Sequence, residues 1–75
     1  MITVKILIDT IDKVRKFSSI TTKENIGGEL VQGVRIVDAK SVMGFFSLDL
    51  NKPVQLNIHS NDKTVLDKIK EFIVE

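Results

Sequence analysis

The sequence predicts a small α+β domain with two layers, one a β-sheet and the other made of helices. Three patterns support this prediction: strand-like segments in which aliphatic residues alternate, helix-like segments with apolar residues three or four apart, and glycines between short apolar stretches. The expected element order is βαββαβα. Because each element has one apolar face, the sheet and the helices can bury each other. The 75 residues leave room for one such core, so we expect one domain over residues 1–75.

The first strand and first helix show these patterns clearly. Aliphatic β-branched residues alternate in residues 2–8, which predicts a strand with one buried face. Asp9 and Thr10 can each cap a helix that runs to about Thr22. The apolar stripe of this helix is expected to consist of Ile11, Val14 and Phe17.

A hairpin and a short helix are expected next. Gly27, Gly28 and Gly33 separate two apolar stretches, residues 29–32 and 34–37, that are too close together for anything but a hairpin. Ser41 can then cap a short helix over residues 42–48. The helix propensity of this segment is low because a glycine lies in its middle.

The last strand follows a turn at residues 51–53, and the last helix ends the predicted order. Val54, Leu56 and Ile58 alternate with polar residues, which places His59 on the polar side. Ser60 or Asn61 can cap the final helix. Its apolar stripe is expected to consist of Val65, Leu66, Ile69, Phe72 and Ile73.

Composition excludes several classes of protein and of site. Eleven basic and ten acidic residues give a net charge of +1, which is too little for a dedicated nucleic-acid-binding protein. No cysteine and a single histidine leave no metal cluster, and we expect no metal and no cofactor. No segment approaches the length of a membrane span, and the first residues lack the features of a secretory signal. We therefore expect no membrane partner and a cytoplasmic location.

The element order and residues 40–48, Lys-Ser-Val-Met-Gly-Phe-Phe-Ser-Leu, resemble HPr, the histidine-containing phosphocarrier family of the bacterial sugar phosphotransferase system. In that family a Lys-Ser-Ile-Met-Gly-type segment opens the second helix. The resemblance implies an HPr-like sandwich with a four-stranded antiparallel sheet and three helices on one face. It also implies protein partners, either components of the phosphotransferase system or a serine kinase.

The sequence departs from the family where the first strand meets the first helix. The family has a Gly-Leu-His-Ala-Arg-Pro-type stretch there, and this chain has Ile-Asp-Thr-Ile-Asp-Lys in residues 8–13. Carrying a phosphoryl group on nitrogen requires a neutral imidazole at a helix N-terminus, where backbone N–H groups hold the phosphate. Asp9 as an acyl-phosphate site is the alternative, but a carboxylate at a helix start ordinarily acts as a cap. We therefore expect a degenerate member of the family that is not an enzyme.

The candidate site residues lie in the second helix. By resemblance, Ser41 corresponds to the serine that a dedicated kinase phosphorylates, although capping alone also explains a serine there. Val42, Met43 and Phe46 are expected on an outward face, where the resemblance places the family's docking surface, with Phe45 and Leu48 turned inward. A buried helix is the alternative, and a homodimer contact is a second use for such a patch.

Three functions are consistent with these features. The first is a protein-binding or regulatory module that docks through the second helix, and the second is a working phosphocarrier, which the missing histidine opposes. The third is a ferredoxin-like or regulatory ligand-binding domain, because this element order also occurs there. The strands lack the exposed aromatic residues of an RNA-binding version.

Overall fold

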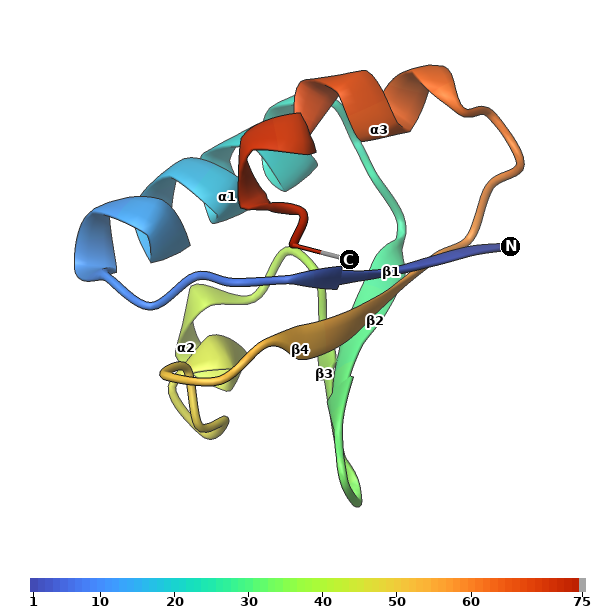
Figure 1. Cartoon of the computed structure of the whole chain (residues 1–75). Coiled ribbons are helices and arrows are strands. Elements are labelled where there is room, and N and C mark those ends of the chain that lie inside the picture. The colour runs from blue at the N-terminus through green and yellow to red at the C-terminus, as the bar shows by residue number, and fades with distance from the viewer. Residues whose placement is uncertain (75) are drawn as a thin grey trace.

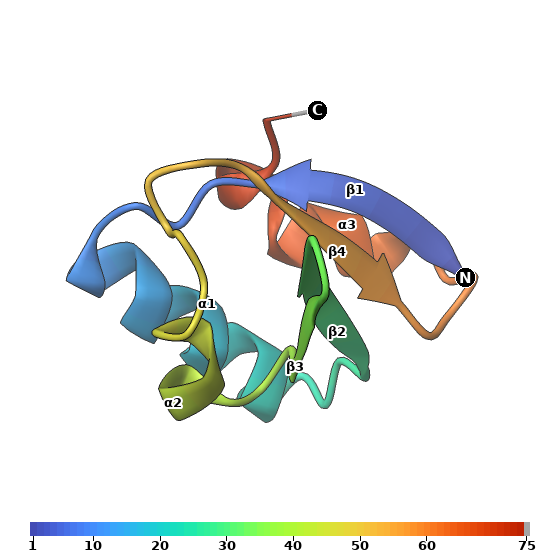
Figure 2. The ribbon, with the colours of Figure 1, turned by 90° about the horizontal axis from the view of Figure 1, so that it is seen from below.

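The computed structural model describes residues 1–74 and places four strands and three helices in two layers (Figure 1). The elements are β1 (Ile2–Ile6), α1 (Ile11–Lys23), β2 (Gly28–Gln32), β3 (Arg35–Asp38), α2 (Val42–Phe45), β4 (Val54–Ile58) and α3 (Thr64–Lys68), followed by the 3₁₀ turn η1 (Lys70–Phe72). The strands form one antiparallel sheet in the order β1-β4-β2-β3. The helices lie on one face of this sheet (Figure 2), which confirms the predicted fold class.

The alternation along the strands determines which face of the sheet is buried. In β4, the side chains of Val54, Leu56 and Ile58 are buried, and the residues between them are half-buried. On the helix-covered face, Leu56 is paired with Val4 of β1 and with Leu30 of β2. The opposite face carries mostly polar residues, as the alternation predicts.

The core between the layers is aliphatic with a cluster of three phenylalanines. Phe17 of α1 meets Phe72 edge-to-face at a ring-centroid distance of 5.4 Å and Phe45 of α2 at 5.9 Å. Pairs in this geometry contribute beyond the area they bury. Phe17 therefore joins α1, α2 and η1.

The hairpin between β2 and β3 turns at Gly33. Gln32 is paired with Arg35, so the loop contains only Gly33 and Val34, and Gly33 has a φ of 62°. A positive φ at the first loop residue suits a type II′ turn and favours glycine. The strands begin and end within one residue of their predicted positions.

The predictions for the first strand and helix need two corrections. The strand ends at Ile6 instead of residue 8, because its partner β4 begins at Val54, opposite Ile6. Ile11 is 58% exposed and is not part of the buried stripe. It is the first residue of α1, and helical side chains tilt toward the N-terminus of the helix, so this side chain extends past the end of the helix and away from the sheet. Of the two cap candidates, Thr10 is the N-cap residue.

The predicted start of the last helix is wrong. Neither Ser60 nor Asn61 caps α3: the Ser60 hydroxyl accepts a hydrogen bond from the N–H of Asp62, and the Asn61 side chain accepts one from the N-terminal amine. Asp62 Oδ1 instead accepts from both the N–H and the hydroxyl of Thr64, because a carboxylate is a stronger acceptor beside a helix start. The apolar stripe continues past α3: Ile69, which lies between α3 and η1, and Phe72, the last residue of η1, are both buried.

The chain after η1 covers one edge of the sheet. The N–H of Leu7 donates to the carbonyl of Phe72, the N–H of Val74 donates to the carbonyl of Lys5, and Ile6 forms an isolated bridge with Ile73. This short pairing occupies the outer side of β1. None of the helices in residues 1–74 is long and apolar enough to cross a membrane.

Candidate functional site

Helix α2 is a single turn that starts at Ser41. The Ser41 hydroxyl accepts a hydrogen bond from the N–H of Gly44 at 3.1 Å, and its carbonyl accepts from the N–H of Phe45 at 3.1 Å. The next bonds, from Ser47 to Gly44 and from Leu48 to Phe45, link residues three apart, so the segment tightens to a 3₁₀ form after Phe45. The predicted helix over residues 42–48 is therefore shorter, but its predicted cap is correct.

Gly44 allows α2 to lie close against β3. A Cβ atom at Gly44 would lie 3.0 Å from Cβ of Val37 and 3.2 Å from the Ser41 hydroxyl oxygen. Both distances are shorter than ordinary van der Waals contact, so a larger residue would move α2 away from the sheet. The sequence shows the glycine but not this contact.

Hydrogen bonds from α1 hold the segment just before α2. The buried hydroxyl of Thr21 donates to the carbonyl of Ala39 at 2.8 Å and also approaches the carbonyl of Ser18 at 3.0 Å. The partly buried hydroxyl of Ser18 donates to the carbonyl of Lys40 at 3.4 Å. The entry into α2 is thus fixed against the first helix.

A glutamine from the sheet holds the segment just after α2. The side-chain amide of Gln32 donates to the carbonyl of Asp49 at 2.9 Å and accepts from the N–H of Asp49 at 2.6 Å. The role of Gln32 is not visible in the sequence, because nothing in its local pattern points to a partner 17 residues away.

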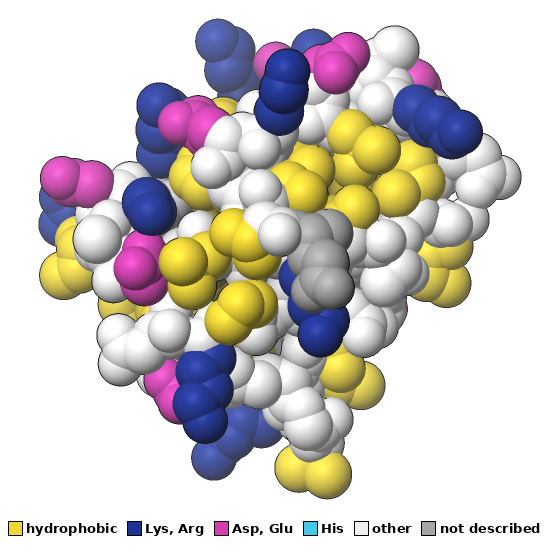
Figure 3. Space-filling view, in the orientation of Figure 1, with side chains coloured by type: hydrophobic (Ala, Val, Ile, Leu, Met, Phe, Trp, Pro, Cys, Tyr) yellow, Lys and Arg dark blue, Asp and Glu magenta, His cyan; other side chains and the backbone are white. Residues whose placement is uncertain are grey.

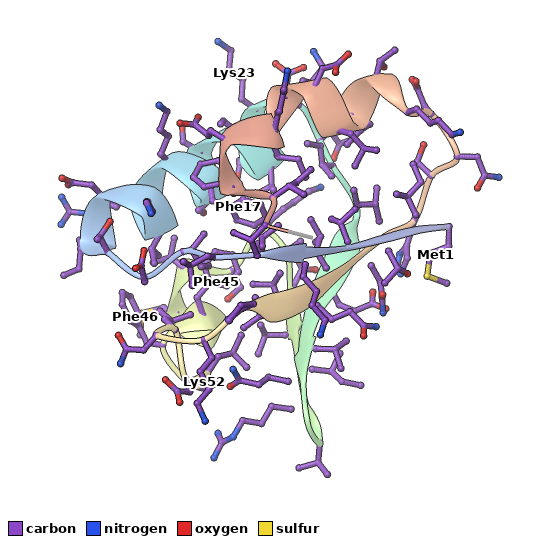
Figure 4. The ribbon with its side chains drawn as sticks, in the orientation of Figure 1. Met1, Phe17, Lys23, Phe45, Phe46 and Lys52 are labelled. Carbon is purple, nitrogen blue, oxygen red and sulfur yellow. The ribbon has the colours of Figure 1, made fainter. Side chains whose placement is uncertain are left out.

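Two of the three predicted docking residues are exposed on one side of α2. Met43 is 84% exposed, Phe46 is 54% exposed, and Val42 is half-buried beside them. Phe46 follows Met43 by three residues and Val42 by four, which puts it beside both on one side of the turn, and we call these three residues the α2 patch. Phe45 points inward toward Phe17 while Phe46 points outward (Figure 4), as predicted, whereas Val42, which was also expected to face outward, packs partly against the core.

The junction between β1 and α1 contains a helix cap and an ion pair. Thr10 Oγ1 accepts a hydrogen bond from the N–H of Lys13 at 3.1 Å, and Lys13 Nζ donates to Asp9 Oδ1 at 3.0 Å. The hydrogen bond from Lys13 lowers the pKa of the Asp9 carboxyl. Residues 8–13 contain no imidazole, so the junction has a carboxylate, a hydroxyl and an exposed isoleucine where a phosphohistidine would require a ring nitrogen.

His59 lies at the other end of the sheet from this junction. Ile58 is paired with Ile2 at the start of β1, whereas α1 follows the end of β1, about 13 Å further along the strand. The His59 side chain is exposed and its Nε2 lies 2.6 Å from Glu29 Oε2. Because its partner is the negatively charged Glu29, His59 is not placed to bind an anion. Its side chain lies on the surface, as predicted.

Charges and cavities in residues 1–74 mark no further site. Basic and acidic side chains are mixed over the helical layer (Figure 3), and several are paired, including Lys16 with Glu71 and Lys68 with Glu24. This part of the chain contains no detected pocket and no group of three or more His, Asp or Glu side chains that could hold a metal ion.

Comparison with known proteins shows a likeness of fold. No protein-family model matches the sequence, and no curated protein matches it. Among solved structures, the crystal structure of HPr-C-His from Thermoanaerobacter tengcongensis superposes with a TM-score of 0.76 and 22% sequence identity, covering 95% of this chain and 89% of that chain. The chain therefore has an HPr-like fold, and at this identity the likeness concerns the fold alone.

Proposed function

We propose that this chain is a non-catalytic, HPr-like module of the cytoplasm that binds a protein partner through the α2 patch. The observation that carries the proposal is the pair of large apolar side chains, Met43 and Phe46, exposed on a turn that is held at both ends. Side chains of this kind are enriched at the centres of protein interfaces.

The junction before α1 supports a binding role over a carrier role. A phosphocarrier needs a nucleophilic nitrogen at the helix start, and Asp9 there is already engaged by Lys13. A partner that approached this side would meet an ion pair and aliphatic surface. We therefore propose that the chain is a degenerate member of the HPr family without enzymatic activity.

Ser41 is the proposed switch of this module. Its hydroxyl caps α2 and its residue is half-buried, directly beside the α2 patch. A phosphate there would add a charge of about −2 next to Val42 and Met43, while the helix start would still offer N–H groups to it. Such a charge would weaken an apolar contact and favour a partner that presents arginine.

The test is a titration of the ¹⁵N-labelled chain with two purified proteins of the phosphotransferase system, its first enzyme and its serine kinase. We expect chemical-shift changes centred on the α2 patch for at least one of them. Phe46→Asp should weaken that binding by about 30-fold, which corresponds to about 2 kcal/mol for an anchor at an interface.

The matched control is Ile36→Asp, which places the same charge at a side chain that is 67% exposed on the opposite face of the sheet. It should leave the affinity unchanged. Absence of binding to both proteins, or equal effects of the two substitutions, would refute docking through the α2 patch.

Phosphate transfer is the second candidate, and the HPr-like fold is the observation that favours it. Incubation with phosphoenolpyruvate and the first enzyme, followed by intact-mass measurement at alkaline pH, distinguishes the two proposals. The binding module should keep its mass. A stoichiometric phosphate adduct would establish the carrier function instead.

A further inference from the structure

We infer that Gln32 is a positioning residue for the α2 patch, an inference that rests on the proposed docking function. Gln32 ends β2, and its side chain reaches across to the segment that follows α2. There it makes two hydrogen bonds to the backbone of a single residue, Asp49, one as donor at 2.9 Å and one as acceptor at 2.6 Å. A side-chain amide paired in this way fixes both the position and the orientation of a peptide group.

No other described side chain outside residues 46–53 forms a hydrogen bond or ion pair with that segment. Its remaining polar contacts are local: Ser47 bonds to Gly44, and Asp49 bonds to Asn51 and pairs with Lys52. The buried side chain of Leu48 keeps the segment on the core but is apolar and non-directional. Gln32 is therefore the polar link between this segment and the sheet.

The shortness of α2 makes this link matter for the patch. A helix of four residues has no stability of its own, so its position depends on the packing of Gly44 and Phe45 and on what holds its two ends. Thr21 holds the entry through Ala39, and Gln32 holds the exit through Asp49. Phe46 lies between α2 and Asp49, and this stretch is held by the apolar contact of Leu48 and by the hydrogen bonds of Gln32, so losing those bonds leaves Phe46 less firmly oriented.

The chemistry of the link supplies a selective test. Glutamine offers both a donor and an acceptor, alanine offers neither, and ionised glutamate offers only acceptors. Protonated glutamate has the shape of glutamine and offers both again. Gln32→Glu should thus lose the link to the Asp49 carbonyl at neutral pH and regain it near the ordinary carboxyl pKa of about 4.3.

The experiment compares the wild type, Gln32→Ala and Gln32→Glu by NMR, with Gln55→Ala as the matched control. Gln55 is also half-buried on a strand, but its amide donates to Asn57 on the other face of the sheet. In Gln32→Ala we expect amide exchange at Asp49 to rise at least about tenfold, because its N–H loses its acceptor, and the Met43 methyl signal to shift and broaden.

In Gln32→Glu the Met43 methyl signal should move back toward its wild-type position as the pH falls from 7 to 3.5. The wild type and the Gln55→Ala variant record any change that the native carboxyl groups, including that of Asp49, cause over the same pH range, and neither should show a return of this kind. Wild-type Met43 and Phe46 signals in Gln32→Ala, or a Gln32→Glu variant without the acid-dependent return, would overturn the inference.

Binding measurements separate this inference from the proposed function. If the wild type binds the first enzyme or the serine kinase, Gln32→Ala should weaken that affinity about tenfold and Gln55→Ala should leave it unchanged. If the wild type binds neither protein, the docking function is lost, and the NMR signals of the α2 patch still decide whether Gln32 positions it.

Discussion

The buried hydroxyl of Thr21 offers the most direct test of how α1 holds the entry into α2. Thr21 is fully buried, and its hydroxyl is the described hydrogen-bond partner of the Ala39 carbonyl at 2.8 Å. Ala39 is itself buried, so water cannot replace the lost donor. Thr21→Val exchanges the hydroxyl for a methyl group of similar size, which removes the donor without opening a cavity.

The expected cost follows from these contacts. The hydrogen bond itself contributes about 1 kcal/mol net, and a buried carbonyl left without a partner costs about 1–3 kcal/mol, while the added methyl group offsets part of this. We expect Thr21→Val to lower the free energy of unfolding by about 2 kcal/mol. For a domain of this size, that corresponds to a fall in Tm of roughly 8–16 °C.

The assay is urea unfolding of Thr21→Val beside Thr22→Val. Thr22 is the next residue of α1 and is exposed, so the same substitution there changes helix propensity equally but removes no buried donor. Thr22→Val should stay within about 0.5 kcal/mol of the wild type. If both variants lose the same free energy, the hydrogen bond to Ala39 does not hold α1 to the segment before α2.

Two further predictions test the sheet and the last helix. A Cβ atom at Gly28 would overlap the backbone carbonyl oxygen of Asn57, so Gly28→Ala should lower the free energy of unfolding by about 3 kcal/mol or more. A Cβ atom at Gly27 meets nothing within 4 Å, so Gly27→Ala should cost less than about 1 kcal/mol. Equal urea midpoints for the two variants would contradict this prediction. The Thr64 hydroxyl and N–H lower the pKa of Asp62 in the folded chain, so protons bind the unfolded chain more tightly and stability must fall as the pH drops from 7 to 3. Asp62→Asn should show a smaller fall in its urea midpoint over that range, and an equal fall would contradict the assigned cause.

Local periodicity in the sequence was sufficient to predict most of the fold. Alternation in β4 correctly predicted its buried residues. Ser41 was correctly predicted as a cap, and Thr10 was one of the two candidates for the cap of α1, because a cap acts on residues only a few positions away. The exposure of Met43 and the burial of Phe45 were predictable for the same reason, since residues two positions apart on a helix point to nearly opposite sides.

Two of the predictions that failed depended on distant parts of the chain, and a third depended on a local choice between neighbouring acceptors. The end of the first strand depends on where its partner β4 begins, and Ile11 is exposed because the helical layer does not extend over its side chain. Ser60 and Asn61 had the right chemistry for a cap, but Asp62 lies closer to the start of α3. The residue types alone do not show which of the three side chains accepts the hydrogen bonds at the start of α3.

By itself, the sequence determined the order of the elements, the faces they bury and the absence of an imidazole between the first strand and first helix. Only the tertiary structure decided that Gln32 binds Asp49, that Thr21 binds Ala39 and that Gly44 lies against Val37. The physical reason is the separation of the residues along the sequence. Periodicity and capping involve residues a few positions apart, whereas most of these contacts join residues far apart in the chain and exist only in the folded two-layer structure.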